Sequence, residues 1–261
     1  MRGRVLAALV AAACVFPFAV LALLSVAELW AFPYPLPPSW RPERWLSVGG
    51  GLFARSVALS LAVSTAVATL STAAGYVTGK YVAGHRRGRA LLFLAYVPFA
   101  MSPVVLGVCL LFLYLKLGLV GTAVGVVLAQ TIFAYGFAIV LFSAFWTPEL
   151  RALEDLVRTL GGGTWAVYRD ALLPASRGAL ALCFFQTFLL SWFQYGLTVL
   201  VGAGRVQTLP VRVFAFVNEA DPYLAALASC LLVGPPLVLV WVNKRFLFAP
   251  DSEDPAPVAH L

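Results

Sequence analysis

Six long apolar runs constrain the fold of this chain more than any other feature of its sequence. A helix of about 20 apolar residues crosses a hydrocarbon layer ~30 Å thick. The runs cover residues 5–27, 53–78, 90–115, 119–146, 178–202 and 223–243. Only 11% of the residues are charged, against about 25% in a soluble domain. We therefore predict an all-α membrane protein with six transmembrane helices.

One amphipathic segment, residues 147–177, interrupts this pattern between the fourth and fifth runs. Its start is marked by Thr147, whose hydroxyl suits the cap of a first helical turn, and by the proline and glutamate that follow. Apolar side chains then recur at spacings of three and four, on one helical face: Leu150, Leu153, Val157 and Leu160. Gly161 is typical of a helix end, Thr164 is expected to cap a second short helix, and Pro174 is expected to end it.

This segment is neutral, because its acids and arginines balance: Glu149, Glu154, Asp155 and Asp170 against Arg151, Arg158, Arg169 and Arg177. A helix that binds lipid would be enriched in lysine and arginine. Neutral charge with an apolar stripe instead favours docking into a groove of another protein. A connector that packs only within its own chain is the alternative.

Basic residues lie unevenly on the two sides that six spans define. The side with both termini holds twelve of the 18 Lys and Arg residues, and the other side holds six. Because cytoplasmic loops carry this excess, we place the termini and residues 147–177 in the cytoplasm. The run within residues 1–27 is too long for a signal peptide and is expected to remain as the first span. The proline-rich loop at 28–52 then lies outside, and the tail at 247–261 is expected to be disordered.

Several classes of function lack the residues that they need. No Asp, Glu, Lys, Arg or His lies near the centre of any run, which argues against buried enzymatic chemistry and ion relays. The four cysteines all fall inside apolar runs, so neither a metal site nor a disulfide framework is expected. The stretch GYVTGK at 75–80 has its glycines one residue too close for a phosphate-binding loop. We predict no enzyme, no nucleotide site and no cofactor bound by this chain.

Uncharged polar side chains gather in the fourth and fifth runs. The residues considered for a solute path are Gln130, Gln186, Ser191, Gln194, Tyr195 and Thr198. Several of those in the fifth run share one helical face. Such a face either lines a partly hydrated path for a polar solute or joins neighbouring helices by hydrogen bonds, and the sequence leaves both open.

The stretch DLVRTLGGGTWAVYRDALLP, from Asp155 to Pro174, resembles the EAA loop of ABC-transporter permeases of the binding-protein-dependent import class. That loop has an acid and two alanines, a glycine after three further residues, and a proline after twelve more. The acid, Gly161 and the proline match without gaps, while leucine and valine replace the alanines. The resemblance extends over residues 55–246, where Gln194 stands in place of a usual acid.

The resemblance implies a MetI-like permease fold, with a transmembrane core at 53–246 and a coupling-helix pair at 147–177. It implies that one set of residues contacts a separate ATPase: Glu154, Asp155, Leu156, Val157, Leu160, Gly161 and Pro174. The implied partners are a cytoplasmic ABC ATPase dimer that binds ATP and magnesium, a second permease subunit, and an extracytoplasmic solute-binding protein. The implied location is a bacterial or archaeal cytoplasmic membrane.

The substrate is open among the solutes that such permeases carry: polyamines, thiamine, iron, phosphonates and oxyanions. Arg205 and Arg212 in an outer loop favour an anion. A stand-alone channel or facilitator without an ATPase is the alternative function.

Overall fold

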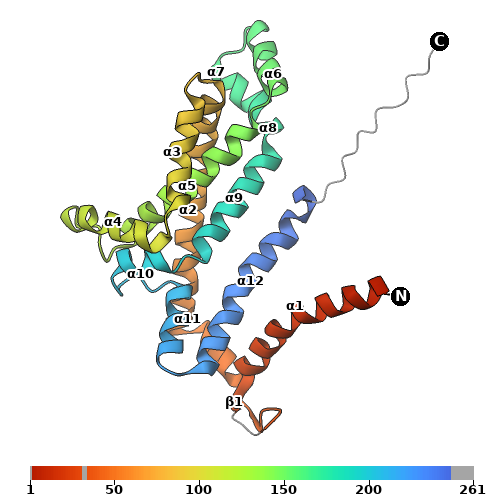
Figure 1. Ribbon diagram of the computed structural model, residues 1–261, viewed down its shortest axis with the longest axis vertical. Helices are drawn as coiled ribbons and strands as arrows, with labels where there is room; N and C mark the ends of the chain where they lie inside the picture. The colour runs from red at the N-terminus through yellow and green to blue at the C-terminus, as the bar shows by residue number, and fades with distance from the viewer. Residues whose placement is uncertain (1, 31–33, 248–261) are drawn as a thin grey trace.

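The computed structural model describes residues 2–30 and 34–247 (Figure 1). Its longer helices are α1 (Arg2–Val26), α2 (Gly51–Gly84), α3 (Gly88–Ala100), α4 (Pro103–Lys116), α5 (Ala123–Phe145), α6 (Pro148–Thr159), α9 (Arg177–Trp192), α11 (Leu209–Asn218) and α12 (Pro222–Leu247). The shorter elements are β1 (Ala27–Leu29), β2 (Ser39–Trp40), the 3₁₀ helix η1 (Pro42–Gly49), α7 (Thr164–Ala166), the π-helical η2 (Val167–Leu172), α8 (Leu173–Ala175) and α10 (Gly196–Gly202).

The predicted all-α class is confirmed. In the described part of the chain, the antiparallel pair of β1 and β2 is the only sheet, and apart from Ala27 it lies in the proline-rich loop predicted at 28–52. The predicted disordered tail at 247–261 lies, apart from its first residue, outside the described residues.

The predicted number of six spans is not confirmed. Within the described residues, three helices are long and apolar enough to cross a membrane: Arg4–Val26 in α1, α2 and α5. Two bent pairs bring the number to five if each counts as one span, namely α3 with α4, bent by 100°, and Thr164–Ala175 with α9, bent by 73°. The remaining apolar helices, α11 and Pro222–Val238 within α12, are shorter.

Two of the predicted spans, the third and the fifth, are each divided into two helices in the structure. Between α3 and α4, Ser102 is extended and its hydroxyl accepts a hydrogen bond from the Val104 N–H (3.4 Å), while Pro103 takes the first position of α4. This is the start signal of a new helix, so the chain turns although its neighbours are apolar. In the fifth, residues 193–195 separate α9 from α10.

α2 and α5 run side by side through the body of the protein (Figure 1). A Cβ atom added to Gly75 would overlap the Cβ of Ala138, and one added to Gly79 would overlap the Cβ of Phe142. Glycines four residues apart allow two membrane helices to pack backbone to backbone. The GYVTGK stretch is therefore a helix-packing contact.

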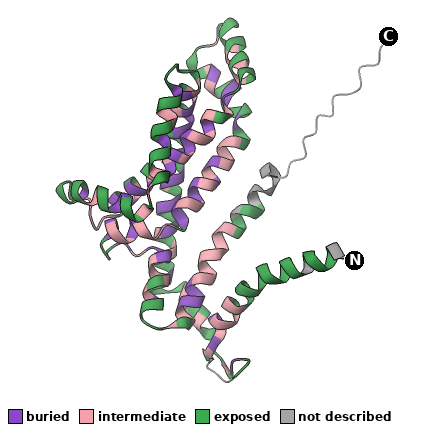
Figure 2. Ribbon diagram, in the orientation of Figure 1, coloured by how far each residue is buried: buried purple, intermediate pink, exposed green. Residues whose placement is uncertain are grey.

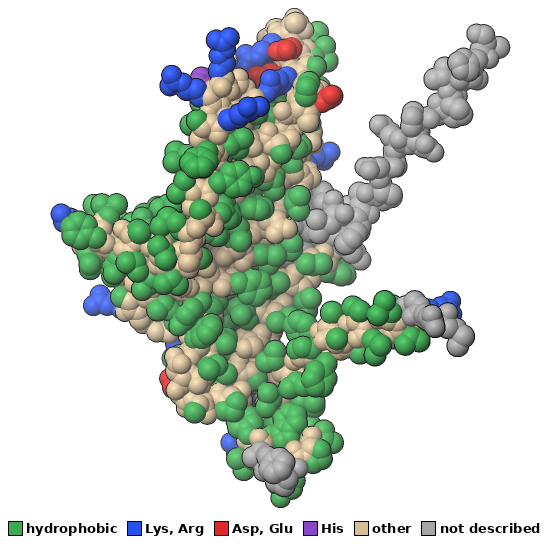
Figure 3. Space-filling view, viewed as in Figure 1, with side chains coloured by type: hydrophobic (Ala, Val, Ile, Leu, Met, Phe, Trp, Pro, Cys, Tyr) green, Lys and Arg blue, Asp and Glu red, His purple; other side chains and the backbone are tan. Residues whose placement is uncertain are grey.

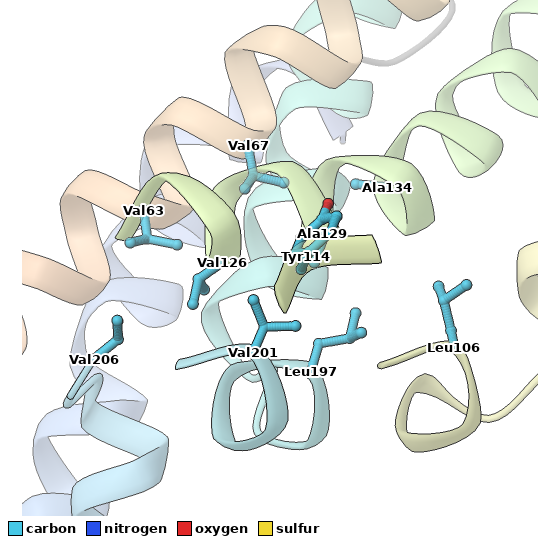
Figure 4. Packing of buried hydrophobic residues seen from close by; sticks show 10 residues of the cluster. All are labelled: Val63, Val67, Leu106, Tyr114, Val126, Ala129, Ala134, Leu197, Val201 and Val206. Atoms are coloured by element: carbon cyan, nitrogen blue, oxygen red, sulfur yellow. The ribbon is translucent and has the colours of Figure 1, made fainter. Parts of the chain in front are cut away.

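Buried hydrophobic side chains surround this helix pair. Figure 4 shows one cluster where α2, α4, α5 and α10 meet, and a second cluster joins α2 to α9, α11 and α12. By contrast, α1 contacts α12 and then leaves the body at an angle, with most of its length exposed (Figures 1 and 2). An apolar helix exposed in this way suits lipid or a neighbouring subunit rather than water.

Candidate functional site

Residues 147–175 form a helical hairpin at one end of the molecule (Figure 1), and we call this segment the hairpin. Its first arm is α6, and its second arm runs through α7, η2 and α8. The Thr147 hydroxyl makes no capping bond to the backbone; it bonds to the Glu149 carboxylate and so lowers the pKa of that group. The residue before the second arm is Gly163 rather than Thr164. The predicted pair of helices is thus present, with different details at both starts.

The reversal between the two arms depends on a pair of glycines. Gly161 has a φ of +82°, the left-handed region that favours glycine. Its N–H donates to the Arg158 carbonyl (3.0 Å), and the N–H of Gly162 donates to the Val157 carbonyl (2.9 Å). These bonds satisfy carbonyls that the end of α6 leaves open. The helix stop predicted at Gly161 is confirmed.

An ion pair ties the hairpin to the end of α2. Lys80 Nζ lies 2.6 Å from Glu154 Oε2, and a guanidinium nitrogen of Arg158 lies 2.8 Å from Glu154 Oε1. Lys80 Nζ also lies 5.4 Å from the ring centroid of Trp146 and 5.0 Å from that of Tyr168, within the range of cation–π attraction. The Glu154 side chain is only 14% exposed. We call these five residues the clamp.

The charges of the clamp keep its carboxylate ionised. Burial of Glu154 acts to raise its pKa, but hydrogen bonds and charge attraction from Lys80 and Arg158 outweigh that effect. The pKa of Glu154 therefore lies below its ordinary value. The Glu154 carboxylate is therefore ionised at neutral pH, as the ion pair requires.

Further contacts hold α6 against the transmembrane helices. The Arg151 guanidinium donates to the Ala83 carbonyl in the last turn of α2 (2.7 Å), where a cation also meets the negative end of the helix dipole. On the same side, Leu150 and Val157 pack against a buried cluster that includes Phe142. One face of α6 is therefore occupied by its own chain.

The outer side of the hairpin is apolar and open. Leu160 is 80% exposed, Trp165 74% and Leu156 55%, and Asp155 beside them is exposed as well. We call these four residues the tip. Figure 3 shows hydrophobic side chains next to acidic and basic ones at this end of the molecule. Large exposed hydrophobic residues rimmed by charge are typical of a surface that binds another protein.

The residues that the family resemblance implies for an ATPase contact fall into two groups in the structure. Exposed at or beside the tip are Asp155, Leu156, Leu160 and Gly161. Glu154 and Val157 instead face their own chain, so the apolar stripe predicted for α6 is split between two surfaces. Pro174 is exposed and lies just before the 73° bend into α9.

The clamp is the part of this site that sequence patterns do not predict. Its signals are a lone lysine at the end of an apolar run and an acid beside the leucine face of α6. The sequence does not show that Lys80 and Glu154 are partners, because they are far apart in the chain. The close packing of α2 on α5 brings them together.

Three of the polar residues considered for a solute path meet in the interior, and we call them the polar junction: Gln130, Ser191 and Thr198. Gln130 Nε2 on α5 donates to Thr198 Oγ1 on α10 (2.8 Å), and Ser191 Oγ on α9 donates to Gln130 Oε1. All three are buried, and the cluster in Figure 4 contains their neighbours along α5 and α10. These hydrogen bonds join three helices.

The other three polar residues lie nearer the surface. Gln186, Gln194 and Tyr195 are half-buried, and the Tyr195 ring stacks on Phe214 with centroids 4.1 Å apart. The Gln194 carbonyl also accepts a hydrogen bond from Thr198 Oγ1 (3.0 Å), which links this group to the polar junction. Among the described residues, no group of three His, Cys, Asp or Glu is placed to hold a metal ion.

No family model matches the chain. Individual proteins, however, are similar to it over most of its length. The diacetylchitobiose uptake system permease protein NgcG of Streptomyces coelicolor is 25% identical over 227 residues, covering 83% of this chain and 74% of that protein. The spermidine/putrescine transport system permease protein PotC of Escherichia coli is 28% identical over 197 residues, covering 74% and 73%. The molybdenum transport system permease protein ModB of Mycobacterium bovis is 29% identical over 221 residues, covering 75% and 81%.

These relatives are permease proteins of uptake or transport systems, and their alignments cover about three quarters or more of this chain. The apolar helices long enough to cross a membrane agree with a transmembrane subunit. The resemblance of this chain to ABC-transporter permease subunits is confirmed by these relatives, since it is similar over about three quarters of its length to permease proteins of uptake and transport systems.

Proposed function

We propose that the chain forms half of a translocation path and couples it to a separate ATPase through the hairpin. The observation that supports this most strongly is the division of the hairpin into two faces. The tip is open to a partner, while the clamp binds the same element to α2. A surface that only packed within its own chain would not leave Leu160 and Trp165 uncovered.

In this proposal the tip and the clamp have different tasks. Leu156, Leu160 and Trp165 fill an apolar groove of the ATPase, and Asp155 pairs with a basic residue at its rim. Movement of the hairpin then reaches α2 through the Lys80–Glu154 ion pair. Gly161 fixes the turn between the arms, so it positions the tip without contributing a side chain.

We assign the solute path to the half-buried polar residues beside the polar junction. Gln186, Gln194 and Tyr195 are the side chains available to a passing solute. Gln130, Ser191 and Thr198 hold the path helices in register, because their hydrogen-bonding groups are engaged with one another. Rocking of one permease half against the other would then open this region to each side in turn.

The proposal requires an assembly in a bacterial cytoplasmic membrane. A second permease subunit supplies the other half of the path, two ATPase copies lie on the hairpin side, and a solute-binding protein lies on the opposite side. The excess of Lys and Arg in the predicted inner loops supports cytoplasmic termini and a cytoplasmic hairpin.

The test is purification of the full chain from its own membranes, followed by ATP hydrolysis measurements on the complex. We expect a soluble ATPase to co-purify, and Leu160→Asp to remove it, because a charge then enters the apolar contact. Leu36→Asp is the matched control, since Leu36 is 61% exposed and lies outside the hairpin. Retention of the ATPase by the Leu160→Asp variant would contradict the tip assignment.

The alternative, a channel that needs no ATPase, makes a different prediction. The purified chain alone, reconstituted in vesicles, would then conduct solute without ATP. Under our proposal the same vesicles are impermeable until the ATPase with ATP, the second permease subunit and the solute-binding protein are added.

A further inference from the structure

A basic pocket lies at the opposite end of α2 from the hairpin. It has a volume of about 450 Å³ and is formed by the start of α2, the turn before α5, and the segment from α10 into α11. Its polar lining is Arg55, Ser56, Arg205, Gln207 and Arg212. Figure 1 shows α11 toward the other end of the long axis from α6 and α7.

The positive charge of this pocket is not balanced by an acid among its lining residues. Three arginines line it, and no aspartate or glutamate does. None of the three takes part in the ion pairs formed among the described residues. Like charges that share a partly enclosed space repel one another, so the arrangement favours a bound anion.

Two buried atoms in the lining lack hydrogen-bond partners. One is the donor Nε of Arg212, and the other is the acceptor Oε1 of Gln207. The Gln207 amide is oriented by its Nε2, which donates to the Gly204 carbonyl (2.6 Å). Buried polar groups are nearly always paired, so an unpaired donor and an unpaired acceptor on two lining residues favour a ligand that both accepts and donates, toward which both side chains would turn on binding.

The surrounding backbone holds these side chains in place. The Leu209 N–H at the start of α11 donates to Ser60 Oγ on α2 (2.7 Å), which fixes the helix that carries Arg212. The stem of Arg205 crosses Gly121, where a Cβ atom would lie 3.0 Å from Arg205 Cδ. A side chain at position 121 would require that arginine to shift and would strain the backbone, whose φ of +77° favours glycine. The pocket is therefore a built site and not a chance gathering of surface charge.

We propose that this pocket binds a small protonated oxyanion, such as hydrogen phosphate or a phosphonate. Guanidinium groups bind such oxygens with paired hydrogen bonds, and the acid proton of the ligand would be donated to Gln207 Oε1. The proposal rests on the proposed function in placing the pocket on the extracytoplasmic side, where it would receive the cargo. A free anion and the phosphate of a lipid headgroup share the oxyanion chemistry, but the phosphodiester group of a headgroup carries no acid proton at neutral pH.

The experiment is calorimetric titration of the full chain in nanodiscs of uncharged phosphatidylcholine, with inorganic phosphate and with sulfate at neutral pH. We expect one phosphate per chain, bound at least tenfold more tightly than sulfate, because sulfate leaves Gln207 Oε1 unpaired. Arg205→Gln and Arg212→Gln should each weaken phosphate binding about ten- to hundredfold, the loss expected for a hydrogen bond to a charged group. Arg205 is exposed, so its replacement preserves the fold.

Two further variants complete the test. Gln207→Leu should remove the preference for phosphate over sulfate. Arg89 is exposed in α3 and lies outside the pocket, so Arg89→Gln should bind phosphate as the wild type does. Equal binding of phosphate and sulfate by the wild type, no binding, or wild-type affinity in Arg212→Gln and Arg205→Gln would overturn the proposal. Nanodiscs with phosphatidylglycerol separate the sources: unchanged phosphate binding supports a free anion, whereas complete displacement by the lipid overturns the protonated ligand. Because no ATPase is present, failure here is distinguishable from failure of the coupling proposal.

Discussion

The two ends of α2 carry basic residues in opposite circumstances. At the hairpin end, Lys80 is paired with Glu154 and lies against two aromatic rings. At the other end, Arg55 lines a pocket with two more arginines and no acid. A charge that is neutralised within the chain can join two elements, while charges left without a counterion favour a ligand. We therefore propose a mechanical task for the hairpin end of α2 and a binding task for the opposite end.

The largest expected effect comes from separating α2 from α5. This change would disturb both the hairpin end and the pocket end of α2. Gly75→Val places a branched side chain where a Cβ already overlaps Ala138, so we expect a loss of about 3 kcal/mol or more in the free energy of unfolding. We expect this loss of stability to appear as a smaller fraction of monodisperse protein after detergent extraction. Gly84→Val is the control, because a Cβ at Gly84 meets nothing within 4 Å. Equal recovery of the two variants would show that close packing at Gly75 is not needed.

The next effect concerns the hairpin end alone. Lys80→Met leaves the largely buried Glu154 carboxylate with only Arg158, and we expect the hairpin to lose about 1–3 kcal/mol of local stability. Hydrogen exchange across residues 147–175 should rise while the exchange of α5 is unchanged. Lys116→Met is the control, since Lys116 lies over Phe112 and forms no ion pair within the described part of the chain. If hydrogen exchange in Lys80→Met is unchanged, the Lys80–Glu154 ion pair does not stabilise the hairpin.

The polar junction should stabilise the helix bundle that lies between the hairpin and the basic pocket. Thr198→Val leaves Gln130 Nε2 without its partner in a buried place, which costs about 1–2 kcal/mol. The melting temperature in detergent should fall, whereas Thr69→Val, whose hydroxyl is exposed and bonds within its own helix, should change little. If both variants melt alike, the junction does not stabilise the bundle.

The smallest effect is a dependence on pH. The pKa of Glu154 is depressed in the folded protein, so its contribution is complete above the unfolded value of about 4.3 and is lost as pH falls through the folded value. Protection of the hairpin against exchange, corrected for intrinsic rates, should therefore decline below about pH 4. Glu154→Gln should abolish this dependence. A decline that persists in that variant would assign it to another acid.

Sequence patterns predicted the parts of this molecule that depend on local chemistry. The helix stop at Gly161 follows from the left-handed backbone that glycine permits, and the long helices α2 and α5 follow from unbroken apolar runs. The break before Pro103 was signalled by the serine–proline pair, but in an apolar run the same pair also fits a kink within one span. Length and hydropathy do not separate a broken helix from a straight one.

Features that depend on packing lay beyond the sequence. The apolar stripe of α6 predicts one buried face but not which partner buries it. In the structure Val157 packs against its own chain, whereas Leu160 is exposed. Likewise, a polar residue in an apolar helix predicts a hydrogen bond or a path, and only the meeting of α5, α9 and α10 decides the partners of Gln130.

The central claim is that the tip binds the ATPase while the clamp transmits its movement to α2. The most direct test is ATP hydrolysis by the assembled transporter, with and without solute-loaded binding protein, in the Lys80→Met variant. We predict that the ATPase stays bound and basal hydrolysis persists, while stimulation by the loaded binding protein is lost. Stimulation equal to that of the wild type would contradict the claim.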